Sequence, residues 1–197
     1  MSVEFVPFPK LYRFNRPVII TEKIDGTNAS VYVPDDPSEP LLFGSRTRWV
    51  TPENDNYGFA RWGTDHADEL RELGPGHHFG EWWGAGIQRK YGMQRKRFSL
   101  FNTSRWEVSR PACCDVVPVL GSASGLYVES VMNALQMLRD MGSYAAPGFM
   151  NPEGIVVYHP ASSSSFKFTL DGDGHKGNAK SPRGITPEAL DERLSTD

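Results

Sequence analysis

The chain has 197 residues, of which 39% are hydrophobic and 23% are charged, and its formal net charge is −3. This length suits one domain with a sizeable core, and the charge argues against a generally basic nucleic-acid coat protein, although not against a local basic groove. The sequence contains no apolar run of about 18 residues that could span a membrane, and its N-terminus lacks the pattern of a signal peptide. The adjacent Cys113 and Cys114 suit neither a structural disulfide nor a zinc site. These features favour a reducing, cytoplasmic setting.

The first half of the chain is predicted to be mostly β-strand. Residues 3–14 mix aromatic residues and prolines and are expected to lie as an extended arm over the domain. Apolar, β-branched runs predict three strands, at 18–22, 28–33 and 41–46. Residues 57–73 are predicted to form a helix, because apolar residues recur among charges before the stop at Gly74-Pro75-Gly76.

The second half combines further strands with the strongest helix signal, at 126–141, where apolar residues recur at three- and four-residue spacing. Strands are predicted at 77–84, 98–102, 115–120, 154–158 and 165–170, and Pro118 places its strand at an edge. The last residues, about 180–197, are expected to be loosely ordered. We therefore expect one α+β domain over 1–197, with mixed, largely antiparallel sheets and flanking helices and no separate C-terminal or oligonucleotide-binding domain.

The stretch Thr21-Glu22-Lys23-Ile24-Asp25-Gly26-Thr27-Asn28 lies between the first two predicted strands. A lysine at a strand end can direct its amine into a cleft, and burial together with neighbouring cations can lower the pKa of that amine until it becomes a nucleophile. The alternative is an exposed lysine in an ordinary Asp-Gly hairpin turn. This stretch by itself leaves both interpretations open.

Four later segments each carry a charged residue at the edge of an apolar strand. They are Ser45-Arg46, Phe79-Gly80-Glu81, Glu153-Gly154-Ile155-Val156-Val157, and Phe166-Lys167-Phe168 followed by Lys176. A single charge of this kind is usually solvated. Taken together with Lys23, in this order and spacing, the segments would supply a nucleophile, further cations and two carboxylates.

These segments, together with Phe98-Ser99-Leu100-Phe101, resemble motifs I, Ia, III, IIIa, IV and V of the covalent nucleotidyltransferases. That superfamily contains ATP-dependent polynucleotide ligases and messenger-RNA capping enzymes. The resemblance covers roughly residues 18 to 177. It is greatest to phage-type RNA ligases, which carry asparagine where Asn28 stands, and the stretch Gly86-Ile87-Gln88-Arg89 is also similar to that branch. The resemblance implies the ATP-grasp-like nucleotidyltransferase domain of these ligases.

The resemblance also implies a reaction and a set of site residues. Lys23 would attack the α-phosphate of ATP, retain AMP and pass it to a 5′-phosphate, after which a 3′-hydroxyl would join the ends and release AMP. The implied partners are RNA ends, single-stranded or in a nicked duplex, and the implied metal is Mg²⁺ or Mn²⁺. Lys167 and Lys176 would assist catalysis, Glu153 would hold the metal, and the nucleotide would contact Glu22, Asn28, Arg46, Glu81, Phe101 and Glu153.

Two features depart from the family pattern. Asn102 follows Phe101 where many ligases have aspartate, and Lys176 comes nine residues after Lys167 rather than two. Three alternatives stay open: an ATP-dependent DNA nick ligase without its oligonucleotide-binding domain, a capping-type guanylyltransferase, and a nucleotide-binding module without turnover.

A basic run with an aromatic residue inside it offers a candidate nucleic-acid surface. Its members are Arg89, Lys90, Tyr91, Arg95, Lys96 and Arg97. Such a run either binds a phosphate backbone or forms an ordinary solvated face.

Overall fold

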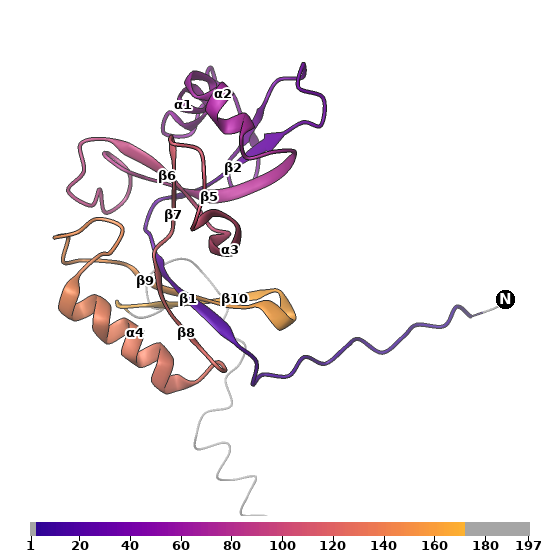
Figure 1. The fold of residues 1–197 in the computed structure, drawn as a ribbon, viewed down its shortest axis with the longest axis vertical. Helices are drawn as coiled ribbons and strands as arrows, with labels where there is room; N and C mark the ends of the chain where they lie inside the picture. Colours follow the sequence, from indigo (N-terminus) through magenta and orange to yellow (C-terminus); the bar gives the residue numbers. More distant parts are fainter. Residues whose placement is uncertain (1–2, 172–197) are drawn as a thin grey trace, which may run out of the picture.

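The computed structural model describes residues 3–171, which form two lobes, each built around its own β-sheet (Figure 1). The four-stranded sheet has the order β10-β9-β1-β8 and the six-stranded sheet the order β4-β3-β2-β5-β6-β7. All neighbouring strands are antiparallel except β6 and β7, which are parallel. The predicted α+β class with largely antiparallel sheets is therefore confirmed.

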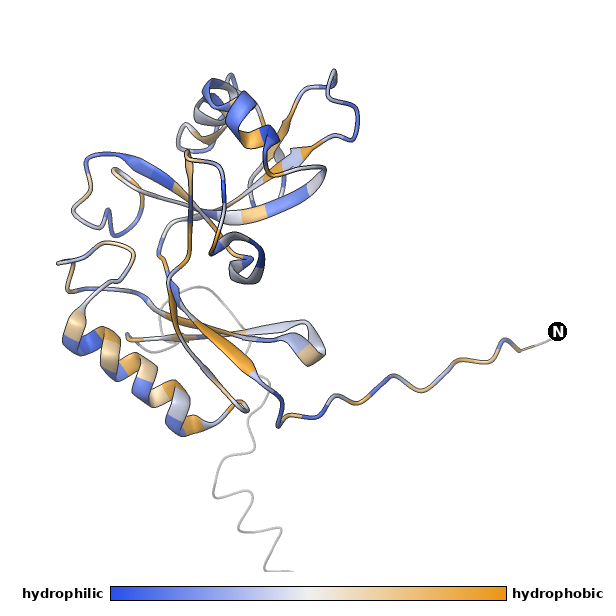
Figure 2. Ribbon diagram, in the orientation of Figure 1, coloured by the Kyte–Doolittle hydropathy of each residue, from blue (hydrophilic) through white to orange (hydrophobic). Residues whose placement is uncertain are grey.

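The four-stranded sheet has one face covered by a helix. Its strands are β1 (Val18–Lys23), β8 (Val119–Ala123), β9 (Gly154–His159) and β10 (Ser164–Thr169), and a short 3-10 helix (Pro160–Ser162) joins the last two. The helix is α4 (Val128–Met141), which turns Val131, Leu135 and Leu138 towards the sheet. Figure 2 shows this apolar stripe on α4 and the hydrophobic stretch of β1. The lobe thus has a purely aliphatic buried core.

The six-stranded sheet carries the larger core. Its strands are β2 (Thr27–Val33), β3 (Leu42–Gly44), β4 (Trp49–Val50), β5 (Gly76–Gly84), β6 (Lys96–Leu100) and β7 (Cys114–Val116). Helices α1 (Phe59–Asp65), α2 (Ala67–Arg71) and α3 (Thr103–Trp106) belong to the same lobe. Phe59 of α1 lies with its ring centre 5.5 Å from that of Trp82 and 5.1 Å from that of Phe98.

The described chain crosses between the two sheets at residues 24–26, after β1, and at residues 117–118, after β7. A third apolar cluster joins the lobes there, with Ile24 and Val117 from the crossings, Trp83 and Tyr91 from the six-stranded lobe and Ala146 from the loop after α4. Lys23, the last residue of β1, therefore lies where the chain leaves one sheet for the other.

Most predicted elements are present with small shifts in their ends, but two are divided. The predicted helix 57–73 is broken at His66 into α1 and α2. The predicted strand 115–120 consists of β7 and β8, which lie at the edges of different sheets. The chain crosses between them at Pro118, which has no N–H for a strand ladder.

The N-terminal arm is extended as predicted but does not lie over the domain. Residues 3–14 are all exposed, and the arm runs away from the four-stranded lobe (Figure 1). Only its base is attached, because the Phe14 carbonyl oxygen lies 3.2 Å from His159 Nε2 and Tyr127 donates a hydrogen bond to Asn15. The expectation that it covers the domain is therefore wrong.

None of the helices between residues 3 and 171 combines the length and apolar character that crossing a bilayer requires.

Candidate active site

Lys23 forms an ion pair at the edge of the four-stranded sheet. Its Nζ lies 2.6 Å from Oε2 of Glu153, and the two side chains are 23% and 11% exposed. Strand alternation explains where the amine lies: Val18 and Ile20 face α4, so Lys23 extends from the opposite face of β1. The lysine is thus partly buried against a carboxylate.

The turn after Lys23 is held by side chains from the other lobe. The Asp25 amide donates to the Tyr91 hydroxyl oxygen at 2.7 Å, and the Gly26 amide donates to Glu81 Oε1 at 3.1 Å. A Cβ at Gly26 would lie 2.5 Å from the Trp82 carbonyl oxygen, so this close approach requires glycine. The hairpin alternative is wrong, because β1 and β2 belong to different sheets.

Glu81 faces Lys23 from the six-stranded sheet. It lies on β5 opposite Asn28 of β2. Burial raises the pKa of the Glu81 carboxyl to about 7, although the Lys23 charge and the Gly26 amide favour the ionised form. The negative charges of Glu153 and Asp25 add to the rise. Glu81 therefore shares one electrostatic site with Lys23, Glu153 and Asp25.

Glu153 comes just before β9 and is 8% exposed. The next residue, Gly154, pairs with Lys23 on one side and with Thr169 of β10 on the other. A Cβ at Gly154 would overlap the Phe168 carbonyl oxygen, which explains glycine at this position. Close pairing of three strands thus fixes where the Glu153 carboxylate meets the Lys23 amine.

Glu22 is buried on the opposite side of β1, with 1% of its surface exposed. Its carboxylate accepts hydrogen bonds from the Ser143 hydroxyl at 2.6 Å and from the amides of Tyr144 and Ala145 at 2.8 and 2.9 Å. Burial raises the pKa of the Glu22 carboxyl, and the three hydrogen bonds limit the rise. In this structure Glu22 anchors the loop after α4, and its contact with a nucleotide stays a prediction.

Lys167 is exposed on β10 and pairs with Val156, which pairs in turn with Thr21 of β1. Its neighbour Phe168 is partly buried and packs against the core that α4 covers, so Lys167 extends from the same sheet face as Lys23. Lys176 lies outside the described residues.

The two remaining predicted residues are on the surface of the six-stranded lobe. Arg46 is exposed in the turn between β3 and β4, and Phe101 follows β6 with 39% exposure. Within residues 3–171, neither side chain has a hydrogen bond or ion pair to Lys23, Glu81 or Glu153. Asn102 uses its side chain to accept from the Arg105 amide and so caps α3.

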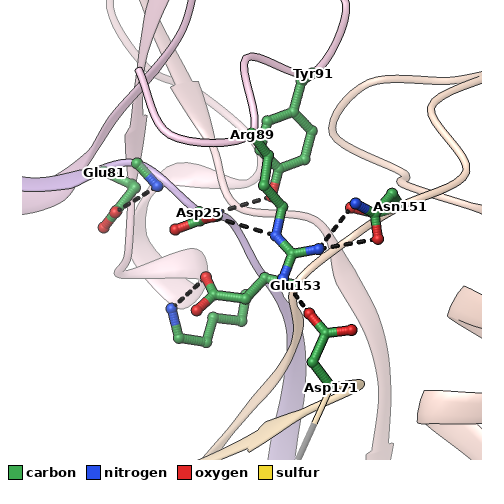
Figure 3. Close-up of polar contacts among 9 residues, drawn as sticks. Asp25, Glu81, Arg89, Tyr91, Asn151, Glu153 and Asp171 are labelled. Carbon is green, nitrogen blue, oxygen red and sulfur yellow. Dashed lines mark hydrogen bonds and ion pairs between the residues drawn. The ribbon is translucent and has the colours of Figure 1, made fainter. Parts of the chain in front are cut away.

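The residues of the basic run have different surroundings, and whether the run binds a phosphate backbone stays a prediction. Tyr91 is 3% exposed, and Lys96 donates to the Tyr57 carbonyl oxygen at 2.6 Å. Arg97 pairs with Asp115 at 2.7 Å. Arg89 reaches Asp25, Asn151 and Asp171 (Figure 3), a role that no local sequence signal indicated.

The described residues offer oxygen ligands for a metal but no complete cage. Within residues 3–171, no group of three or more histidine, cysteine, aspartate or glutamate side chains is arranged to hold a metal ion. Mg²⁺ is usually bound by one or two carboxylates together with water and substrate phosphates. A single carboxylate such as Glu153 therefore fits a metal shared with a bound nucleotide.

Comparison with known proteins gives a consistent match. Residues 16–169 match the profile of a protein family described as RNA ligase. A variant of Naegleria gruberi RNA ligase with ATP and Mn has 20% identity and a TM-score of 0.59, covering 79% of this chain and 50% of that one. Another variant, with AMP and Mn, has 18% identity and a TM-score of 0.55, covering 80% and 51%.

An apo variant of the same ligase has 21% identity and a TM-score of 0.56, with 79% and 50% coverage. At these identities the structures establish the shared fold. The chain spans about half the length of the structures it matches. No protein with a curated description matches it.

Proposed function

The chain belongs to the RNA ligase family, and on that premise we propose that it is an ATP-dependent RNA ligase in which Lys23 carries AMP. The observation that supports this most strongly is the ion pair between Lys23 and Glu153 at the crossing between the sheets, with Glu81 acting on the same amine from the other lobe. A nucleotide bound there would contact both lobes.

In the first step, the Lys23 Nζ attacks the α-phosphorus of ATP. The new nitrogen–phosphorus bond replaces the bond from that phosphorus to the bridging oxygen, pyrophosphate leaves, and the amine loses its protons to solvent. The attacking amine must be unprotonated. Lys167, on the same sheet face, and Lys176 would neutralise charge on the phosphates.

In the second step, an oxygen of an RNA 5′-phosphate attacks the same phosphorus and releases Lys23, which leaves AMP joined to the RNA end. In the third, a 3′-hydroxyl attacks the 5′-phosphate, the ends are joined and AMP departs. RNA ends are thus the proposed substrate.

The nucleotide would be held from both lobes. Glu81 and Asn28 lie opposite each other on β5 and β2, where Glu81 would accept from a ribose hydroxyl. Phe101 would stack on adenine through its exposed ring, and Arg46 would contact phosphate through its fork of donors. Mg²⁺ or Mn²⁺, held by Glu153, would supply charge neutralisation at the phosphates.

The test is self-labelling with ATP carrying a labelled α-phosphate, in the presence of Mg²⁺ or Mn²⁺. We expect the wild type to acquire label and Lys23→Ala to acquire none. Lys10→Ala, which removes an exposed lysine of the arm, is the control and should label normally. An unlabelled wild type, or a labelled Lys23→Ala, would contradict the proposal.

End joining then separates the related activities. We expect sealing of RNA-containing ends in preference to a nicked DNA duplex. Preference for the DNA nick would indicate a DNA ligase, stronger labelling from GTP would indicate a capping-type enzyme, and ATP binding without release of pyrophosphate would indicate a binding module.

A further inference from the structure

The loop between β5 and β6, residues 85–95, has an unusual backbone. Gln88, Lys90 and Tyr91 adopt positive φ angles of 43°, 60° and 51° without being glycine. Such conformations are strained for residues that carry a side chain, and they persist only where surrounding contacts enforce them. The loop is therefore held in place by its neighbours.

Apolar contacts fix part of the loop. Ile87 is 0% exposed, and the Tyr91 ring lies 5.0 Å from Trp83 and 4.7 Å from Phe149 between ring centres. Phe149 belongs to the segment that leads to Glu153, so the loop bridges the two lobes. The buried Tyr91 hydroxyl also fixes the Asp25 amide.

The polar contacts that fix the loop come from one side chain, Arg89, shown in Figure 3. Its Nε donates to Asp25 at 3.2 Å, one terminal nitrogen donates to the carbonyl and side-chain oxygens of Asn151 at 3.2 and 2.9 Å, and the other donates to Asp171 at 2.5 Å. Arg89 is 18% exposed, and Asp171, the outermost partner, is 61% exposed.

These partners are close in sequence to the proposed reacting groups. Asp25 comes two residues after Lys23, Asn151 two residues before Glu153, and Asp171 two residues after the end of β10, the strand that carries Lys167. Because consecutive Cα atoms are a fixed 3.8 Å apart, fixing these positions limits how far the active groups can move. One planar guanidinium thus ties together three segments that meet at the ion pair.

We propose that Arg89 is a positioning residue for adenylyl transfer. It holds the Lys23 turn, the Glu153 segment and the end of β10 in fixed positions relative to one another. This proposal rests on the proposed function for its catalytic consequence. The role requires arginine, because its rigid fork serves several acceptors at once, whereas a lysine ammonium is a single point of charge on a flexible stem.

Amide hydrogen exchange tests the positioning without depending on the reaction. In Arg89→Ala, we expect the Asp25 and Gly26 amides to exchange roughly tenfold faster, because the turn loses a restraint. The Val31 amide, in the six-stranded core, should not change. Arg139→Ala, which removes an exposed arginine of α4, is the matched control and should leave all three amides unchanged. Unaltered exchange at Asp25 and Gly26 in Arg89→Ala would overturn the proposal.

Self-labelling kinetics test the consequence. A displaced nucleophile can lose about 100-fold in rate, so in Arg89→Ala we expect a loss of about 10- to 100-fold at saturating ATP with little change in KM for ATP. Arg89→Lys should recover only part of the loss. Asp171→Ala, which removes the most exposed partner, should cost less than about fivefold.

Chemical rescue distinguishes positioning from general destabilisation. Millimolar guanidinium should restore part of the rate of Arg89→Ala, whereas a merely unstable variant would gain nothing, because this concentration is far too low to change folding stability. A wild-type rate in Arg89→Ala, or a loss that guanidinium does not relieve, would overturn the proposal. If the wild type takes no label, the proposed ligase function fails, and hydrogen exchange still decides whether Arg89 holds these segments.

Discussion

The two lobes are stabilised by different kinds of core. The six-stranded lobe buries aromatic rings, among them Phe59, Trp82 and Phe98, whereas the buried core of the four-stranded lobe is aliphatic. The proposed active groups lie outside both cores, on strands that contribute to them. Trp82 enters the aromatic core while its neighbour Glu81 faces Lys23, and Ile20 faces α4 while Lys23 does not.

One strand can thus contribute to stability on one face and to chemistry on the other, because successive side chains alternate between the faces. Substitutions in the cores should therefore reduce the free energy of unfolding, and substitutions at the lobe junction should reduce the rate of labelling. The following experiments test that separation.

The largest expected effect is on the aromatic core. Phe98→Ala should lower the free energy of unfolding by about 3–5 kcal/mol, because it removes a fully buried ring and leaves a cavity. Leu138→Ala, in the aliphatic core, should cost about 2–4 kcal/mol. Urea unfolding followed by circular dichroism measures both. A greater loss for Leu138→Ala would reverse the ranking of the two cores.

Glu153→Gln should affect labelling more than stability. It keeps the shape of the side chain but removes the carboxylate charge that would hold the metal at the phosphates. We therefore expect the labelling rate to fall about 100-fold, or about 2.7 kcal/mol in activation free energy. Glu107→Gln, at an exposed position, is the control and should label at the normal rate. An equal loss of folding stability would show that Glu153 is mainly structural.

Ser143→Ala should destabilise the four-stranded lobe. Ser143 donates to the buried Glu22 carboxylate and accepts from the Ala146 amide, so its removal leaves buried polar groups without partners, at about 1–3 kcal/mol. Thermal unfolding compares it with Ser122→Ala, at an exposed position on β8, which should change little. Equal melting temperatures for the two variants would show that the Ser143 hydrogen bonds contribute nothing measurable.

The smallest expected effect is a pH dependence due to Glu81. Its folded-state pKa of about 7 exceeds the ordinary value of 4.5, so the native state holds a proton that the unfolded chain releases. Stability should therefore fall as the pH rises through this window, by about 1–2 kcal/mol between pH 6 and pH 8. Glu81→Gln should lack this decrease, as urea unfolding at several pH values would measure. Parallel curves for the two proteins would show that Glu81 titrates normally.

The family, the strand-rich α+β class and the approximate positions of most elements could all be predicted from the amino-acid sequence alone. Local patterns were enough, because strand alternation and the lysine motif are properties of short stretches. They also indicated Lys23, Glu81 and Glu153, which the structure brings into one electrostatic site.

The sheet that each strand joins, and the side chains that meet across the lobes, became known only from the folded chain. Nothing local indicates that the chain crosses between sheets at Pro118, that Glu22 anchors the loop after α4, or that Arg89 reaches Asp25, Asn151 and Asp171. The reason is physical: a strand pattern specifies which face is apolar, whereas contacts between residues as far apart as Lys23 and Glu153 depend on how whole sheets pack.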